Sequence, residues 1–182
     1  MAESERIVLG SGELYCMEYT GTMPEDSAIE TDDNRLGFIA GGASVEYKPT
    51  FYSCKDDLGR VQKSVLTDEE ATLKSGVMTW VAATLQKLCT TGRVTEDATK
   101  KVRTLKIGGV GNQDGKSYIL HFVHKDPEGD IRLTIVGRNE AGFTLTFAKD
   151  KETVIDAEFK AQPKIDKEGT LIVYKETIPT TA

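Results

Sequence analysis

The chain has 182 residues, a formal net charge of -6 and a sequence pI near 5.1. This length fits one domain, which we expect to span residues 1–182 and to bury about 70% of its unfolded surface without disulfides or metal ions. The acidic balance argues against a protein that grips nucleic acid by its phosphates.

The three cysteines, Cys16, Cys54 and Cys89, are an odd number without paired spacing. This favours reduced, partly buried thiols over a disulfide framework or a zinc site. Residues 1–12 lack the basic start and apolar run of a signal peptide, and no segment is apolar enough to cross a bilayer. We therefore expect synthesis in a cytoplasm and no membrane partner.

Residues 6–17 alternate loosely enough for a first strand. From Glu13 to Asp33 the chain has seven acidic side chains and no lysine or arginine. Residues 21–34 contain turn formers and few apolar residues, so we predict a loop that like-charge repulsion keeps extended. This loop is either solvated surface or an acidic surface at an interface or along a passage.

Residues 36–47, LGFIAGGASVEY, predict a strand with a bulge or close backbone approach at Gly41 and Gly42, ended by Pro49. The following residues, PTFYSCKDDLGRVQ, carry two adjacent aromatic side chains before the turn-prone KDDLG. They indicate a long hairpin tip or protruding loop over residues 49–67. Residues 71–78 predict a further strand.

One segment, residues 79–91, has the pattern of an amphipathic helix. Its apolar stripe has helical spacing: Val77, Val81, Leu85 and Leu88. The Thr79 hydroxyl suits an N-cap, and Gly92 suits the left-handed residue that closes a helix. Residues 95–101 fit a helical turn or coil equally.

The C-terminal half predicts short strands separated by turns. The expected strands are 102–107, 117–123, 131–136, 143–147, 153–159 and 170–174. Strands at such spacing, with one helix among them, predict a mainly β fold: an antiparallel β-sandwich or barrel with one flanking α-helix.

Several motifs approach known functional patterns without matching them. Residues 108–117, GGVGNQDGKS, miss the phosphate-binding loop because Val110 stands where the first glycine belongs, and a strand pattern follows Ser117. His121 and His124 lie three apart on an expected strand, hence on opposite faces, and cannot share a metal ion. No serine lies in a nucleophile elbow.

Acidic residues offer no better-defined site. Asp126, Glu128 and Asp130 alternate like the start of a calcium loop, but no glycine follows Asp130, so a charged turn around Pro127 is the better interpretation. The lone Trp80 fits a packed position better than a sugar-binding platform. We predict no catalytic, cofactor-binding or metal-binding residues, and hence no cofactor.

Long stretches of the chain resemble a known family. They are GFIAGGASVEYKPTFYSCKDDLG, then EATLKSGVMTW leading into TLQKLCTTG, then FTLTFAKDKETVIDAEFKAQP with EGTLIVYKE. Together they span about Leu36 to Glu176 and resemble the major tail proteins, or tail tube proteins, of long-tailed bacteriophages and related prophages. The closing strand, turn and strand are the most characteristic part.

The resemblance implies a non-enzymatic structural subunit of the virion tail, assembled in the bacterial host cytoplasm. Subunits of this family form hexameric rings that stack into a hollow tube, through which DNA passes on ejection without specific binding. Tape-measure and tail-terminator proteins are the implied partners. The helix would flank the sandwich outside the strands that form the lumen, and carboxylates along the lumen would repel phosphates.

The protruding segments are the candidates for contacts between subunits or rings, and they contribute these residues: Glu25, Asp26, Asp32, Asp33, Phe51, Tyr52, Asp56 and Asp57. Three alternatives stay open. The same fold serves contractile tails and type VI-like injection machines. A β-sandwich that binds carbohydrate or a receptor is the second, and a hydrolase with paired carboxylates is the third.

Overall fold

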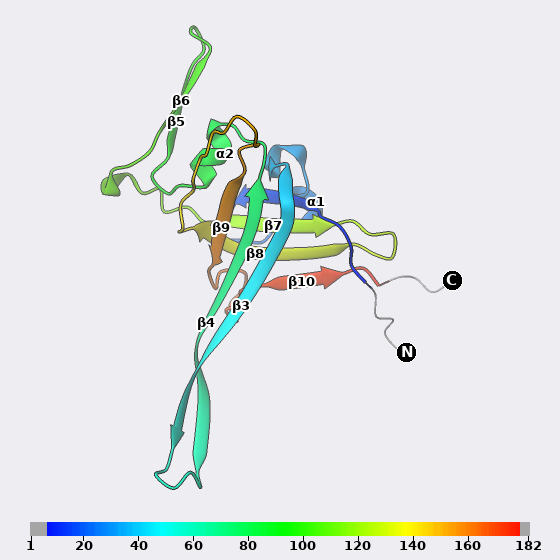
Figure 1. Cartoon of the computed structure of the whole chain (residues 1–182), viewed down its shortest axis with the longest axis vertical. Coiled ribbons are helices and arrows are strands. Elements are labelled where there is room, and N and C mark those ends of the chain that lie inside the picture. Colours follow the sequence, from blue (N-terminus) through cyan, green and yellow to red (C-terminus); the bar gives the residue numbers. More distant parts are fainter. Residues whose placement is uncertain (1–6, 179–182) are drawn as a thin grey trace.

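The computed structural model describes residues 7–178, which form a mainly β fold (Figure 1). The strands are β1 (Glu13–Glu18), β2 (Arg35–Gly37), β3 (Ile39–Lys55), β4 (Gln62–Val77), β5 (Arg93–Asp97), β6 (Val102–Lys106), β7 (Tyr118–His124), β8 (Ile131–Asn139), β9 (Ile155–Ala161) and β10 (Val173–Glu176). The helices are α1 (Asp26–Ile29) and α2 (Ala82–Lys87), with 3-10 turns at Asp32–Asn34 and Val110–Asn112. The predicted fold class, antiparallel β structure with a flanking helix, is confirmed.

One eight-stranded antiparallel sheet contains all strands except the separate β5–β6 hairpin, and its order is β2-β1-β7-β8-β9-β4-β3. The strand β8 forms the corner of this sheet. Its residues Ile131 to Thr134 pair with β10, whereas Gly137 to Asn139 pair with β9. Because β8 changes partner along its length, the two halves of the sheet run in different directions (Figure 1).

The main core lies where these two halves face each other. Fully buried side chains from both halves meet there, among them Leu14, Leu73, Leu120, Ile135 and Phe159. A second, smaller cluster covers the opposite face of β1, β7 and β8, with Ile29 of α1 packed on Ile119 and Val136. Strands β1, β7 and β8 are thus covered on both faces, as the nearly continuous burial of β7 requires.

The helix is shorter than the sequence pattern predicts. The strand predicted over residues 71–78 is confirmed as the end of β4, but the helix begins only at Ala82. The Thr79 hydroxyl accepts a hydrogen bond from the Phe38 backbone N–H (2.8 Å) instead of capping the helix. Val81 is the N-cap residue and is 53% exposed, so the predicted inward stripe is wrong at this position. The fully buried anchor is Leu88, directly after α2, while Leu85 and Trp80 pack on the core in part.

Gly92 also has a different role from the predicted left-handed cap. Its backbone N–H donates to the Cys89 carbonyl (3.1 Å). A Cβ at this position would approach Cys89 Sγ to 2.6 Å, so the glycine allows close packing after the helix.

Several predicted boundaries also change. Gly41 and Gly42 interrupt the β3–β4 register as predicted, but Pro49 does not end the strand, since it pairs with Glu69 within a strand that continues to Lys55. A proline fits there because β3 is an edge strand, whose outer N–H groups have no ladder partner.

In the N-terminal part, the first strand begins at Glu13, and Arg6 lies outside the described residues. Residues 95–101 belong to the β5–β6 hairpin, and residues 143–147, which the structure does describe, form no strand. Cys54 is exposed, contrary to the expected partial burial of all three thiols.

We predict that Leu88→Ala lowers the free energy of unfolding by about 2–5 kcal/mol, because it removes a fully buried side chain. Val81→Ala, at an exposed position of the same segment, should change it by less than about 0.5 kcal/mol. Urea unfolding of the two variants measures the difference. Equal effects would show that α2 is not anchored through Leu88.

Candidate assembly interface

The β3–β4 hairpin extends far beyond the sheet that it belongs to (Figure 1). Strand β4 pairs with β9 only from Thr72 to Val77, whereas its pairing with β3 continues out to Gln62. From Lys48 to Lys55 the two strands therefore stand alone, and at about 3.3 Å per residue they project roughly 25 Å. Every described side chain of β4 before Ala71 is exposed.

This projecting hairpin carries apolar side chains on both of its faces. Phe51 lies opposite Leu66, and the neighbouring pair Tyr52 and Val65 points to the other face because successive residues of a strand alternate. The four side chains are 59%, 42%, 65% and 48% exposed in that order. Neither face is covered by any described residue of the chain, so both are available to partners.

The acidic residues at the hairpin tip form the turn. Asp56 Oδ1 accepts a hydrogen bond from the Val61 backbone N–H (2.7 Å), and this bond lowers the pKa of the Asp56 carboxyl. Asp56 also lies 3.6 Å from the Arg60 guanidinium. Asp57 is exposed in the turn itself. Asp56 therefore sets the geometry of the tip, and Asp57 is the acidic side chain that the tip presents.

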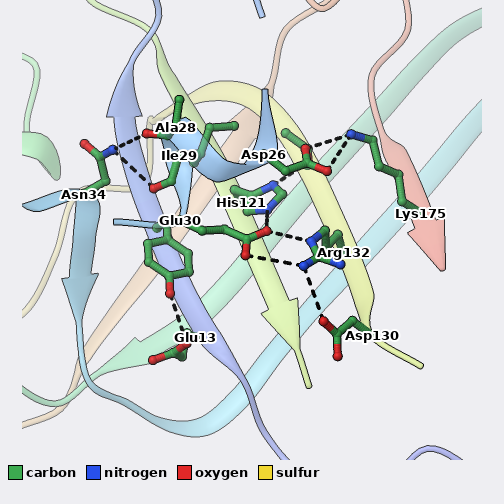
Figure 2. A network of polar contacts seen from close by, with 12 residues as sticks. Glu13, Asp26, Ala28, Ile29, Glu30, Asn34, His121, Asp130, Arg132 and Lys175 are labelled. Atoms are coloured by element: carbon green, nitrogen blue, oxygen red, sulfur yellow. Dashed lines mark hydrogen bonds and ion pairs between the residues drawn. The ribbon is translucent and has the colours of Figure 1, made fainter. Parts of the chain in front are cut away.

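The acidic segment from residue 21 to 34 is not the extended loop that its charges predict. It folds back on the sheet as α1 and a 3-10 turn, and Ile29 is fully buried. Asn34 Nδ2 donates to the Ala28 and Ile29 carbonyls (3.1 and 3.2 Å) and closes the turn. Figure 2 shows this segment held over β7 and β8 by a network of polar contacts.

At the centre of the network is Glu30. Its carboxylate accepts hydrogen bonds from Arg132 Nε (2.6 Å) and His121 Nε2 (3.2 Å). Arg132 also lies 3.3 Å from Asp130, and Asp26 accepts from Lys175 of β10 (2.7 Å) (Figure 2). Arg132 of β8 and Lys175 of β10 thus neutralise carboxylates of the acidic segment and oppose the repulsion among them.

The protonation states follow from the contacts. His121 is fully buried, and burial holds its pKa below the ordinary 6.5 despite the nearby Glu30 carboxylate. The neutral ring donates from Nε2 to Glu30 and accepts at Nδ1 from the Thr134 hydroxyl (2.8 Å). Burial tends to raise the pKa of Glu30, but hydrogen bonds from Arg132 and His121 outweigh it, and the pKa lies below 4.5.

The candidate residues therefore divide into separate groups. Phe51, Tyr52, Asp56 and Asp57 lie on the projecting hairpin, whereas the other four lie on the folded acidic segment. Of these four, Asp26 pairs with Lys175 and Asp32 with Arg35 (2.8 Å). Glu25 and Asp33 are exposed and form no ion pair with any residue between 7 and 178.

Sequence reasoning missed Val65 and Leu66, the cross-strand partners of the two aromatic residues. The symmetric placement of two apolar pairs about the KDDLG turn is the signal that identifies them. It also missed the Glu30 network, for which the sequence gives no signal because its members lie 91 and 102 positions apart.

The exposed face of β3, β4 and β9 is a mosaic of charges. Its side chains are Ser44, Glu46, Lys48, Glu70, Thr72, Lys74, Asp156, Glu158 and Lys160. Lys48 contacts Glu46 (2.9 Å), Lys74 contacts Glu158 (3.0 Å) and Lys160 contacts Glu70 (2.7 Å). Every lysine of this face is thus neutralised by a carboxylate on the same face, and Asp156 leaves it with a net negative charge.

Other motifs have structural positions. His121 and His124 lie on one strand as predicted, and each is buried against its own partners, with His124 Nδ1 bonded to the Ser11 carbonyl (2.6 Å). Asp126 caps the predicted turn by accepting from the Glu128 N–H (2.8 Å).

Within residues 7–178, no group of three or more His, Cys, Asp or Glu side chains is placed to hold a metal ion. The helices of that range are too short to span a membrane.

The comparisons with known proteins add no family to this description. No protein-family model matches the chain, and no curated protein matches it. Function must therefore be argued from the geometry above.

We predict that the protein loses stability on acidification in two steps. His121 binds a proton more readily in the unfolded chain, because burial lowers its pKa in the fold. The free energy of unfolding should therefore be unaffected by His121 above about pH 6.5 and should fall as the pH drops below that value. Glu30 adds a second loss below pH 4.5, because its pKa is lower in the folded chain. Urea unfolding at several pH values should show both steps, and His121→Gln should remove the first.

The Glu30 contacts can be tested separately at neutral pH. Glu30→Gln should lower the free energy of unfolding by about 1–3 kcal/mol, because it weakens charge-assisted hydrogen bonds to Arg132 and His121. Glu18→Gln is the matched control, since Glu18 forms an exposed pair with Lys116 and should contribute less than about 1 kcal/mol. A Glu30 effect as small as the control would contradict the clamping role of the network.

Proposed function

We propose that this protein is the structural subunit of a phage tail tube, which assembles into stacked hexameric rings around a lumen for DNA. The observation that carries the proposal is the projecting β3–β4 hairpin with apolar pairs on both faces. The resemblance of residues 36–176 to tail tube proteins supplies the class of assembly. In this proposal the protein is not an enzyme and works in the virion tail.

The hairpin has the properties of a segment that is stabilised by partners. An isolated two-stranded hairpin is marginally stable in water, because it lacks a third strand or a helix to cover a face. Exposed aromatic and aliphatic side chains on such a hairpin form a surface that associates with other chains. Because both faces are apolar, the hairpin suits insertion between two neighbouring subunits better than docking on a single flat surface.

The free edge of the sheet supports the same proposal. Outside the β3–β4 pairing, β3 has no strand partner among residues 7–178, and its 17 residues offer a long row of backbone donors and acceptors. Ring closure pairs or covers such edges by repeating one contact between different surfaces of identical chains. A closed ring then provides the surfaces on which the next ring stacks.

The mosaic face of β3, β4 and β9 suits the wall of a DNA passage. The side chains that β3, β4 and β9 contribute to this face include no large apolar one, so their burial against another protein would gain little hydrophobic energy. Its lysines are held by carboxylates, which leaves no unpaired cation on this face for a phosphate. We propose that this face lines the lumen, with tape-measure protein and DNA as its successive contents and a terminator protein at the tube end.

We predict that Phe51→Ser combined with Tyr52→Ser prevents formation of rings and tubes without changing the midpoint of urea unfolding. The two side chains are exposed in the free subunit, so their loss removes interface contacts and no core packing. Electron microscopy of concentrated protein, with sedimentation velocity, measures assembly.

The matched control is Phe147→Ser combined with Val110→Ser, which removes two exposed apolar side chains outside the hairpin. This control should assemble like the parent. If the hairpin variant also assembles like the parent, the hairpin is not the interface. A parent that stays monomeric at every concentration and salt, but binds a sugar in a glycan screen, would favour the alternative of a carbohydrate-binding module.

The lumen assignment predicts a net acidic inner wall in the assembled tube. A cryo-electron microscopy reconstruction should place Glu46, Glu70 and Glu158 on the inner surface, each with its lysine partner. A tube with a mainly basic lumen, or with this face on the outside, would show the assignment to be wrong even if the tube itself forms.

A further inference from the structure

The β5–β6 hairpin is a second projecting element, and it is structurally separate from the main sheet. Its two strands form a sheet of their own, and Figure 1 shows them extending away from the end of the molecule opposite the β3–β4 tip. Only Val94 and Leu105, an opposed pair, are partly buried, whereas the other residues from 93 to 106 are exposed. The hairpin therefore gains little stability from its own chain.

This hairpin is basic in an acidic protein. Residues 93–106 contain five cationic side chains, Arg93, Lys100, Lys101, Arg103 and Lys106, against Glu96 and Asp97. Within the hairpin, Arg103 contacts Glu96 (3.2 Å) and Lys100 contacts Asp97 (3.4 Å). Both acidic side chains of the hairpin are therefore paired. The remaining three cations, Arg93, Lys101 and Lys106, have no carboxylate within ion-pair distance among residues 7–178.

Two of these cations are placed directly opposite each other. Arg93 and Lys106 form a cross-strand pair, so their side chains leave the same face of the hairpin at its base. Like charges in this arrangement repel and weaken a hairpin that is already marginal. A carboxylate-rich partner close to both cations would attract each of them and offset the repulsion between them.

The same chain contains a matching surface. From residue 21 to 34 there are five acidic side chains and no basic one. Inside the subunit, Asp26, Glu30 and Asp32 are paired with cations, but Glu25 and Asp33 are exposed without a described cationic partner. The network shown in Figure 2 holds this segment in place on the sheet, so it offers a fixed surface and not a mobile chain.

We propose that the basic β5–β6 hairpin of one subunit docks on the acidic segment, residues 21–34, of a second copy of the same chain. In Figure 1 the β5–β6 hairpin and α1 lie on different sides of the upper part of the molecule, so the hairpin and the acidic segment are two separate surfaces of one subunit. Such a contact repeats around a ring or along a filament when it is heterologous, and it occurs twice in one dimer when it is reciprocal. The proposal rests on self-association of the chain, as the proposed function does, but not on a tube.

The first experiment measures self-association by sedimentation velocity over a range of salt. The screening length falls from about 10 Å at 0.1 M salt to about 3 Å at 1 M, so association through this contact should weaken as salt rises. Arg93→Glu with Lys106→Glu should weaken association at low salt by about tenfold or more, because like charges then face each other. The hairpin itself should be no less stable, since one like-charged pair replaces another.

A charge exchange makes the test specific. Glu25→Lys with Asp33→Lys should weaken association to the same extent as the hairpin variant, and a chain that carries all four substitutions should recover it. Lys149→Glu with Lys167→Glu is the control, since it makes the same charge change at exposed positions elsewhere. Circular dichroism and thermal unfolding of each variant confirm that the fold is intact.

Each outcome decides the inference. Recovery in the four-substitution chain supports it. Weakening without recovery, or variants equal to the control, overturns it. Retention of duplex DNA by the parent that is lost in the hairpin variant, with self-association unchanged, also overturns it and makes the hairpin a nucleic-acid contact.

The same experiment separates this inference from the proposed function. Tubes that form equally well from every variant would leave the tail tube proposal standing and refute the hairpin contact. Salt-sensitive association that follows the charge exchange, without rings or tubes from the parent, would do the reverse. A parent that stays monomeric throughout would refute both.

Discussion

The structure depends on the unequal pairing of one strand, β4. Over its last six residues β4 has β9 on one side and β3 on the other, and there its side chains alternate between the core and solvent. Before Ala71 its only partner is β3, and every side chain is exposed. The same continuous strand therefore anchors a hairpin in the core at one end and presents it to solvent at the other. A core mutation near Leu73 would consequently alter the base from which the hairpin projects.

Local patterns predicted the strands and the protruding hairpin well, because period-two alternation and turn residues act over a few neighbours. They were wrong where a distant partner decides. Thr79 suits a helix N-cap, yet its hydroxyl accepts a hydrogen bond from the Phe38 backbone N–H, 41 positions earlier. Pro49 reads as a strand end, yet an edge position tolerates it. The acidic segment folds because Arg132 and Lys175, more than 100 residues later, neutralise it.

The distribution of paired and unpaired charges carries more information than the net charge. On the mosaic face, and in the network around Glu30, each cation lies beside a carboxylate of the same subunit. Exposed pairs of this kind contribute little to stability, but they remove charge from surfaces that would otherwise attract or repel partners. Three cations of the β5–β6 hairpin, Arg93, Lys101 and Lys106, lack this neutralisation, and so do the carboxylates of Glu25 and Asp33. The two groups have opposite signs.

The two projecting hairpins therefore differ in the force that they offer to a partner. The β3–β4 hairpin offers apolar area, whose association strengthens with buried surface and is little affected by screening. The β5–β6 hairpin offers charge, which acts over a longer range and guides the first encounter, but weakens as salt screens it. An assembly that uses both can orient subunits through charge and then hold them through apolar burial. This order also gives a reason for placing the hairpins at opposite ends of the molecule, since each then meets a different neighbour.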